Sequence, residues 1–133
     1  MRFLLDTCVI SDFARGHSRT LERINSAAPA DLAASTITRM EIAYGLLLNP
    51  SLARQLAPVM DALFASIRVL AYGEEAAAAT ATARAGLKRR GRPIGAFDIL
   101  IAGTALAHDL TLVTSNVREL GQIEGLRIED WRS

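Results

Sequence analysis

The sequence predicts an α/β protein in which helices alternate with the short strands of a parallel sheet. Short apolar runs recur along the chain, and segments with helical periodicity separate them. The first run, residues 3–5, has no polar residue, as expected of a strand covered on both faces. Half of the 133 residues are hydrophobic, which suits a real core. We therefore expect residues 1–133 to form a single domain.

The composition favours a cytoplasmic protein without a membrane span. No apolar run approaches the length of a transmembrane helix, and the N-terminus lacks the features of a signal peptide. The single cysteine, Cys8, cannot form an internal disulfide, which fits a reducing compartment. The net charge of +1 is too balanced to indicate a nucleic-acid partner by itself.

The first predicted strand, Arg2–Leu5, ends on a carboxylate, Asp6. Thr7 can cap the helix that follows, whose apolar residues are Val9, Ile10 and Phe13. In open α/β sheets, ligands bind beyond the carboxyl ends of the strands, where Asp6 stands. An aspartate at this place is more often a helix cap or a turn residue. Convergence of other acids on Asp6 would favour a functional site.

The next segments predict a helix over Leu21–Ala28, a strand over Asp31–Ser35 and a longer helix. Ser35, Thr36 or Thr38 can cap the longer helix. One face of it holds Ile37, Met40, Glu41, Tyr44 and Leu48. This spacing places Glu41 on the buried side. The run 38–41 also matches a capping box, in which Glu41 only accepts a backbone N–H. The two roles of Glu41 are equally supported.

The middle of the chain predicts a helix over Leu52–Ile67 that is interrupted near Pro58, followed by a strand over Arg68–Tyr72. The helix after it, Gly73–Arg90, has glutamates in its first turn and three basic residues in its last. This arrangement complements the helix dipole at both ends. The basic cluster therefore has a structural explanation before any functional one.

The helix Ala96–Ala107 has one charged side chain, Asp98, among apolar residues on nearly every face. An unpaired carboxylate in a buried helix is costly, although a place in the first turn reduces the cost. A structural role would need a nearby arginine, and Arg92 is available. A lone acid in such a helix is the best single functional hint in the chain.

The last segments predict a strand over Leu110–Thr114, a short helix that contains Glu119, and an edge strand over Gly125–Trp131. Three polar residues follow the first of these strands: Thr114, Ser115 and Asn116. If this strand neighbours Arg2–Leu5, the polar residues and Asp6 open onto one crevice. The helices that carry Glu41 and Asp98 would then enter from either side.

Three carboxylates with no lysine beside them repel one another, and bound cations would make the cluster tolerable. Oxygen ligands without thiolates or imidazoles suit Mg²⁺ or Mn²⁺, and the two histidines, His17 and His108, have no ligand spacing. A carboxylate-held Mg²⁺ commonly serves phosphoryl chemistry.

Four segments in order resemble the motif blocks of PIN-domain nucleases, and most of all those of the VapC-type toxins of bacterial toxin–antitoxin pairs. The resemblance covers nearly the whole chain, and the segments are LLDTCVISDF, TRMEIAYGL, GAFDILIAGTALAH and LVTSNVREL. It implies a PIN-like three-layer fold with a short, mostly parallel β-sheet flanked by helices. It also implies an Mg²⁺- or Mn²⁺-dependent endoribonuclease that hydrolyses RNA by a metal-activated water.

The resemblance assigns residues to this site. Asp6, Glu41 and Asp98 match the acidic triad, with Asp6 and Asp98 as direct metal ligands and Glu41 reaching the metal directly or through water. At the fourth position, where the family often has aspartate, this chain has Asn116. Thr7 and Thr114 match polar positions that steady the acids, and Ser115 lies beside them.

The resemblance also implies an RNA substrate, a homodimer and a cognate antitoxin whose C-terminal segment lies in the active-site groove. Three arginines just before Asp98 become candidates for holding RNA phosphates: Arg89, Arg90 and Arg92. Compensation of the helix dipole is the structural alternative for these residues.

Two other enzyme classes begin with a strand that ends in aspartate. A haloacid-dehalogenase-type phosphatase needs an acid where this chain has Cys8, and a receiver domain needs a lysine after a late strand, whereas Lys88 ends a helix. The alternative that stays open is a PIN-like module that binds RNA or a partner protein without cutting.

Overall fold

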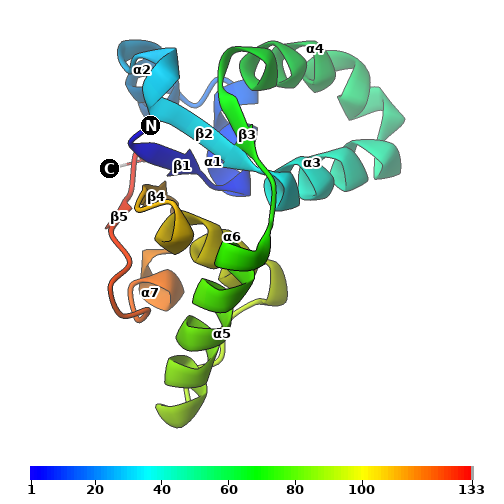
Figure 1. The fold of residues 1–133 in the computed structure, drawn as a ribbon. Helices are drawn as coiled ribbons and strands as arrows, with labels where there is room; N and C mark the ends of the chain where they lie inside the picture. Colours follow the sequence, from blue (N-terminus) through cyan, green and yellow to red (C-terminus); the bar gives the residue numbers. More distant parts are fainter. Residues whose placement is uncertain (133) are drawn as a thin grey trace.

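A computed structural model describes residues 1–132, with helices on both faces of a five-stranded parallel sheet (Figure 1). The strands are β1 (Phe3–Leu5), β2 (Leu32–Ser35), β3 (Arg68–Leu70), β4 (Thr111–Val113) and β5 (Ile128–Glu129). The helices are α1 (Thr7–Ala14), α2 (Ser18–Ser26), α3 (Thr36–Leu48), α4 (Pro50–Ser66), α5 (Glu74–Arg89), α6 (Ala96–Ala107) and α7 (Val117–Leu120), with a 3₁₀ turn at Pro29–Asp31. The predicted α/β class is confirmed.

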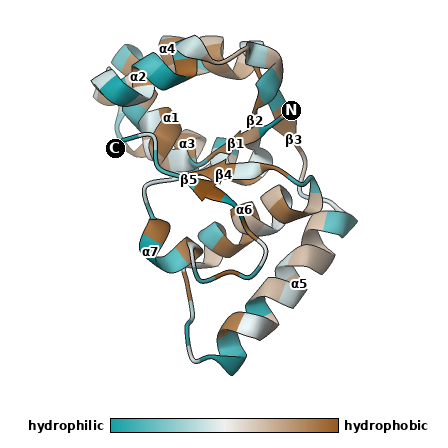
Figure 2. Ribbon diagram, turned by 90° about the vertical axis from the view of Figure 1, so that its left-hand side faces the viewer, coloured by the Kyte–Doolittle hydropathy of each residue, from teal (hydrophilic) through white to brown (hydrophobic). Residues whose placement is uncertain are grey.

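The sheet separates two hydrophobic cores because neighbouring residues of a strand point to opposite faces. Leu5 packs with α1 and α4 on one face, whereas Leu4 packs with α6 on the other. Figure 2 shows the resulting layers, with α1–α4 on one side of the sheet and α5–α7 on the other. The central strands are mainly apolar because both of their faces are covered.

The strand order is β3-β2-β1-β4-β5, and each neighbouring pair is parallel. The chain first builds outward from β1 to β3 and then returns to the other side of β1. The direction of winding therefore changes between β1 and β4, where Leu5 pairs with Val113. Ligands bind in α/β sheets at such a switch point, beyond the carboxyl ends of the strands. The predicted neighbourhood of these two strands is confirmed.

Several predicted boundaries were wrong. Helix α2 begins at Ser18, three residues before the prediction, because His17 accepts the Thr20 N–H and caps it. Helix α4 runs unbroken through Pro58, because a buried apolar stripe spans the proline. That stripe is Leu56, Met60, Leu63 and Phe64. The strands at both edges of the sheet are shorter than predicted.

The predicted buried face of α3 was also wrong. Thr38 and Ile42 are the buried residues of this helix, whereas Tyr44 and Leu48 are 62% and 68% exposed. Thr38 is buried because its N–H and hydroxyl group meet the Ser35 side chain, which caps the helix. Polar bonding therefore turned α3 away from the orientation that its apolar spacing favours. Glu41 is half-buried.

The described residues, 1–132, include no helix that is both long enough and apolar enough to span a bilayer.

The end of the chain is fastened to α1. Trp131 is 3% exposed and packs edge-on against Phe3, with ring centroids 5.1 Å apart. The Arg132 guanidinium donates Nε to Asp12 Oδ2 at 2.6 Å and Nη2 to Asp12 Oδ1 at 2.8 Å. These hydrogen bonds, opposed by burial, hold the pKa of Asp12 below its ordinary value. The ion pair joins the first helix to the last residues that the structure describes.

Replacement of Asp12 by asparagine is expected to lower the free energy of unfolding by about 1–2 kcal/mol at neutral pH, since the bidentate pair is lost. A carboxyl group whose pKa is lowered by folding stabilises the protein above its unfolded pKa. The difference between variant and wild type should therefore shrink as the pH falls below about 4. Urea unfolding of both proteins at neutral pH and again below about pH 4 measures this difference in the free energy of unfolding.

The matched control for this prediction is Asp109→Asn. Asp109 pairs with Arg127 at 2.9 Å, but both side chains are well exposed, and asparagine tolerates the positive φ of 54° at this position. Its loss should cost less than about 1 kcal/mol. Equal effects of the two substitutions would contradict the importance of the Asp12 pair.

Candidate active site

Asp6 lies immediately after β1, beyond the carboxyl ends of β1 and β4, where the sequence predicts the crevice to open. Its backbone N–H donates to Val113 O at 2.9 Å, which ties it to the neighbouring strand β4. Its Oδ1 accepts the Thr7 N–H at 2.7 Å, and its Oδ2 accepts the Thr114 hydroxyl at 2.7 Å. Asp6, and not Thr7 as predicted, therefore caps α1. The Asp6 carboxylate therefore caps α1 and, at the same time, lies where the sequence predicts the site.

Burial raises the pKa of Asp6, since its side chain is almost entirely out of water and the residue is 5% exposed. Its hydrogen bonds with Thr114 and Thr7 act in the opposite direction and favour the ionised form. The charges of Asp98 and Glu41 raise the pKa further. The charges of the acids on α3 and α6 therefore act on Asp6.

Glu41 enters the crevice from α3 and meets the first residue of α1. The Thr7 hydroxyl donates to Glu41 Oε1 at 2.7 Å. The Thr38 hydroxyl lies 3.2 Å from that of Thr7, and the Ser35 hydroxyl lies 3.3 Å from that of Thr38. The capping box that the sequence allowed does not form, because Ser35 caps α3 and Glu41 turns toward Thr7. A chain of hydroxyl groups thus holds the glutamate.

Asp98 stands in the first turn of α6 and is held by an amide. The Asn116 Nδ2 group donates to Asp98 Oδ2 at 3.2 Å and to Glu119 Oε2 at 3.1 Å. Burial raises the pKa of Asp98, the Asn116 hydrogen bond lowers it, and the charge of Glu119 raises it again. The amide of Asn116 therefore bridges two carboxylates that would otherwise repel each other.

Glu119 is the residue that sequence reasoning did not place in the site. It was assigned only to a short helix after β4. The available signal was its distance of three residues from Asn116, which puts both side chains on one face of a helical turn. Glu119 thus places, beside Asn116, the negative charge that an aspartate at position 116 would carry.

The site acids have no basic partner within residues 1–132. The ion pairs found there are Arg23–Glu129, Arg127–Asp109 and Arg132–Asp12, and none of them includes a site acid. The arginine that a structural role of Asp98 required, Arg92, does not pair with it. Uncompensated carboxylates of this kind are suited to a divalent cation.

The acids are not drawn together into a closed metal cage. In the described part of the chain, no three Asp, Glu, His or Cys side chains lie close enough to enclose an ion. Mg²⁺ keeps several waters and is usually bound by one or two carboxylates together with substrate phosphate, so it needs no such cage. The donor set therefore fits a partly hydrated Mg²⁺ or Mn²⁺.

The remaining predicted residues lie around this centre. The Ser115 hydroxyl donates to Cys8 Sγ at 3.3 Å, and burial followed by the charge of Asp6 raises the pKa of the Cys8 thiol. Cys8 therefore stays protonated and is unsuited to nucleophilic attack. Three arginines are exposed at the end of α5 and in the loop after it: Arg89, Arg90 and Arg92. Arg90 Nη2 donates to Gln122 O.

A family model described as "PIN domain" matches residues 3–125 of the chain. Two curated relatives carry the name "tRNA(fMet)-specific endonuclease VapC". The relative from Shigella flexneri is 36% identical over 131 residues and the one from Salmonella typhimurium 37% over 134 residues. The alignment with each covers 98% of this chain and 98% of the relative.

The solved structures agree with this similarity. A crystal structure of DNA-bound VapBC from Salmonella typhimurium contains a chain that is 37% identical to this one. It superimposes with a TM-score of 0.89 and covers 98% of both chains. This chain and the matched chain of the VapBC structure therefore share the same fold.

Replacement of Asp98 by asparagine is expected to raise the free energy of unfolding of the metal-free protein by up to about 1 kcal/mol at neutral pH. The amide oxygen can still accept from Asn116, while repulsion by Glu119 is removed. Since folding raises the pKa of Asp98, its ionisation destabilises the protein increasingly as the pH rises above the unfolded pKa of about 4, and the gain should vanish below that pH.

Urea unfolding in EDTA measures this gain. Asp61→Asn is the control, because Asp61 is an exposed residue of α4 far along the chain from the site acids. A loss of stability in Asp98→Asn at neutral pH would mean that the Asp98 carboxylate supports the fold.

Proposed function

This chain belongs to the PIN-domain family, and on that premise we propose that it is a metal-dependent endoribonuclease that uses Mg²⁺ or Mn²⁺. It is a VapC ribonuclease, the toxin of a toxin–antitoxin pair, as its similarity to VapC relatives over nearly the whole chain indicates. PIN-domain ribonucleases generally depend on divalent metals. We also propose that residues 1–133 act as one PIN domain.

The observation that carries the proposal is that acids from four elements gather beyond the carboxyl ends of β1 and β4, and that none of them has a basic partner among residues 1–132. Asp6 follows β1, Glu41 comes from α3, Asp98 from α6 and Glu119 from α7. The raised pKa values of Asp6 and Asp98 reflect this convergence in part. A protein keeps such a costly cluster where function requires it.

We assign Asp6 and Asp98 to direct binding of the cation, and Glu41 to binding it directly or through a water. When bound, the cation activates water and neutralises the charge that develops on the phosphate oxygens. Thr7 orients Glu41, and Thr114 orients Asp6, each through a hydrogen bond of 2.7 Å. Asn116 orients Asp98 and Glu119 together.

The substrate class that the relatives support is tRNA, since two of them are named as tRNA(fMet)-specific endonucleases. Three exposed arginines precede α6 and are available to contact phosphates of the RNA: Arg89, Arg90 and Arg92. Arg90 is also used to hold the loop after α7, so Arg89 and Arg92 are the freer of the three.

We propose two protein partners. A cognate antitoxin covers the crevice with its C-terminal segment, and the similarity to VapBC structures supports an antitoxin partner. A second copy of the chain forms a homodimer. The outer face of α3 supports this assembly, because it exposes a continuous apolar stripe of Met40, Tyr44, Leu47 and Leu48.

Purified, antitoxin-free protein is expected to cleave tRNA with Mg²⁺ or Mn²⁺ and to lose this activity in EDTA. Asp98→Asn should lower the rate at least about a hundredfold while the protein stays folded, because one carboxylate ligand is lost. The measurement is cleavage of total cellular RNA and of its tRNA fraction by both proteins, with Asp61→Asn as the control.

Equal cleavage by wild type and Asp98→Asn would indicate a contaminating ribonuclease or a wrongly placed site. If folded wild-type protein cleaves no RNA under any of these conditions, the non-cleaving RNA- or partner-binding module becomes the better account of the chain.

The binding of Mn²⁺ without RNA tests the metal site separately from cleavage. Asn116→Asp is expected to tighten binding roughly tenfold, because it adds a negative charge beside Asp98 and Glu119. Asn116→Ala should weaken binding, since it frees both carboxylates from the amide that orients them. Electron paramagnetic resonance measures free Mn²⁺ in each titration. Weaker binding by Asn116→Asp would show that the amide donor matters more than charge.

A further inference from the structure

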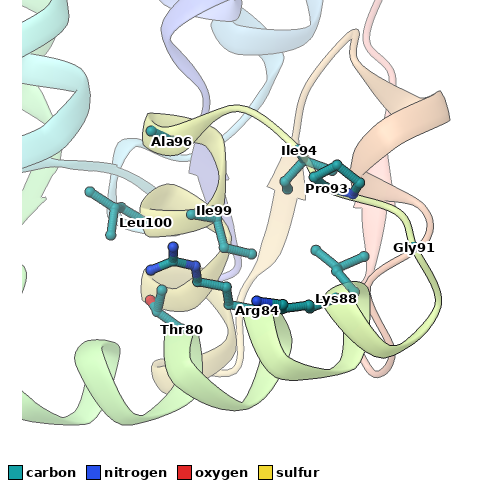
Figure 3. A pocket seen from close by; sticks show the side chains of 10 residues that line it. Thr80, Arg84, Lys88, Gly91, Pro93, Ile94, Ala96, Ile99 and Leu100 are labelled. Atoms are coloured by element: carbon teal, nitrogen blue, oxygen red, sulfur yellow. The ribbon is translucent and has the colours of Figure 1, made fainter.

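A pocket of 680 Å³ lies between α5 and α6, under the loop that joins them (Figure 3). Aliphatic side chains make up most of its wall: Leu87, Pro93, Ile94, Ile99 and Leu100. The only polar uncharged side chain in the wall is that of Thr80, whose hydroxyl already bonds with Ala76 O and Tyr72 OH. The volume is within the range of sites that hold small molecules or single nucleotides.

The charged residues that line the pocket are both basic. Arg84 and Lys88 stand one turn apart on α5, and Figure 3 shows Arg84 reaching from α5 toward α6. Neither residue takes part in the ion pairs found within residues 1–132. The sequence has no acidic residue between Glu75 and Asp98. The pocket therefore suits a ligand with an apolar part and a negative charge.

An exposed aromatic residue of α6 lies, around the helix axis, between the residues that line this pocket and Asp98. Successive residues of a helix are turned by about 100°. In the first turn of α6, Ala96 lines the pocket, Phe97 follows it around the helix, and Asp98 lies beyond Phe97 on the side of Asn116. Phe97 is 47% exposed. A strand of RNA that passes from the pocket to Asp98 would cross this ring.

We propose that the pocket, with Phe97 at its edge, holds an unpaired nucleotide next to the phosphodiester bond that is cut. The proposal rests on the ribonuclease function above. The base lies against the aliphatic wall or the ring of Phe97, and its phosphate is held by Arg84 and Lys88. Sequence-tolerant base contacts of this kind combine apolar or aromatic faces with a basic surface. The subsite thus selects RNA that is single-stranded at the cleavage position.

Binding of RNA tests this subsite apart from chemistry. All proteins carry Asp98→Asn so that the RNA is not cut, and the probe is a short fluorescein-labelled single-stranded RNA with the sequence around the mapped cleavage position. Phe97→Ala and Arg84→Ala are each expected to lower affinity roughly tenfold. Phe97→Tyr should retain affinity because it keeps a ring. Arg54→Ala, an exposed arginine on α4, is the control and should bind as the parent does.

A second probe assigns the contact to a base. The affinity of each protein is compared for RNAs that lack one base. Loss of the base beside the cleaved bond should lower the affinity of the parent protein, but it should have little further effect on the affinity of Phe97→Ala. If removal of a base and the Phe97→Ala substitution lower the affinity additively for every RNA, the proposed subsite is overturned. Unchanged affinity of Phe97→Ala and Arg84→Ala would overturn it as well, and light scattering of the same variants would then show whether the face contacts a second copy of the chain.

The control arm separates this proposal from the function on which it rests. If wild-type protein cleaves RNA with metal while the two variants bind RNA as the parent does, only the subsite is wrong. If wild-type protein neither binds nor cleaves RNA, the ribonuclease function fails and the subsite falls with it.

Discussion

The burial of one negative charge, that of Asp6, governs the structure around the crevice. A buried carboxylate is tolerated only if its oxygens find donors. Here the shortest of these hydrogen bonds, each 2.7 Å long, come from the first N–H of α1 and the hydroxyl group of Thr114 after β4. Both lie at the carboxyl end of the sheet, where the strand order changes direction. The pairing of β1 with β4 therefore determines whether Asp6 can be held at all, and the same pairing creates the crevice that the other acids enter.

The other acids are held by the same principle. Glu41 receives the hydroxyl group of Thr7, and Asp98 and Glu119 share the amide of Asn116. Hydroxyl and amide donors fix the direction of a carboxylate without cancelling its charge. An arginine or lysine in any of these places would have stabilised the protein but would also have neutralised the field that attracts a cation. Because these donors are neutral, the negative charge of the acids stays available to attract a cation. The repulsion that remains between the acids lowers the stability of the protein.

Much of this could be predicted from sequence because it depends on local patterns. Apolar runs located β1 and β4, and a lone acid in an apolar helix pointed to Asp98. What the sequence did not predict depends on contacts between segments. The rotation of α3 follows from the bond between Thr38 and Ser35, which overrides apolar spacing. The place of Glu119 follows from the fork of the Asn116 amide. The spacing of three residues allows Asn116 and Glu119 to share a face, but it does not indicate that the amide also reaches Asp98. The local effect of Pro58 predicts an interruption of the helix, whereas the buried stripe on both sides of Pro58 decides that α4 continues.

Helix α1 connects the stability of the fold to the geometry of the site. Its first residue, Thr7, holds Glu41, and its cap, Asp6, lies at the base of the crevice. Near its other end, Asp12 accepts hydrogen bonds from Arg132. The preceding residue, Trp131, packs on Phe3 of β1. A helix fixed at both ends cannot rotate, so the Thr7 hydroxyl keeps its direction toward Glu41. Because the stabilising ion pair lies more than one helical turn away from the crevice, it supports the acids without touching their charge. Stability gained at one end of α1 thus offsets the repulsion that is retained at the other.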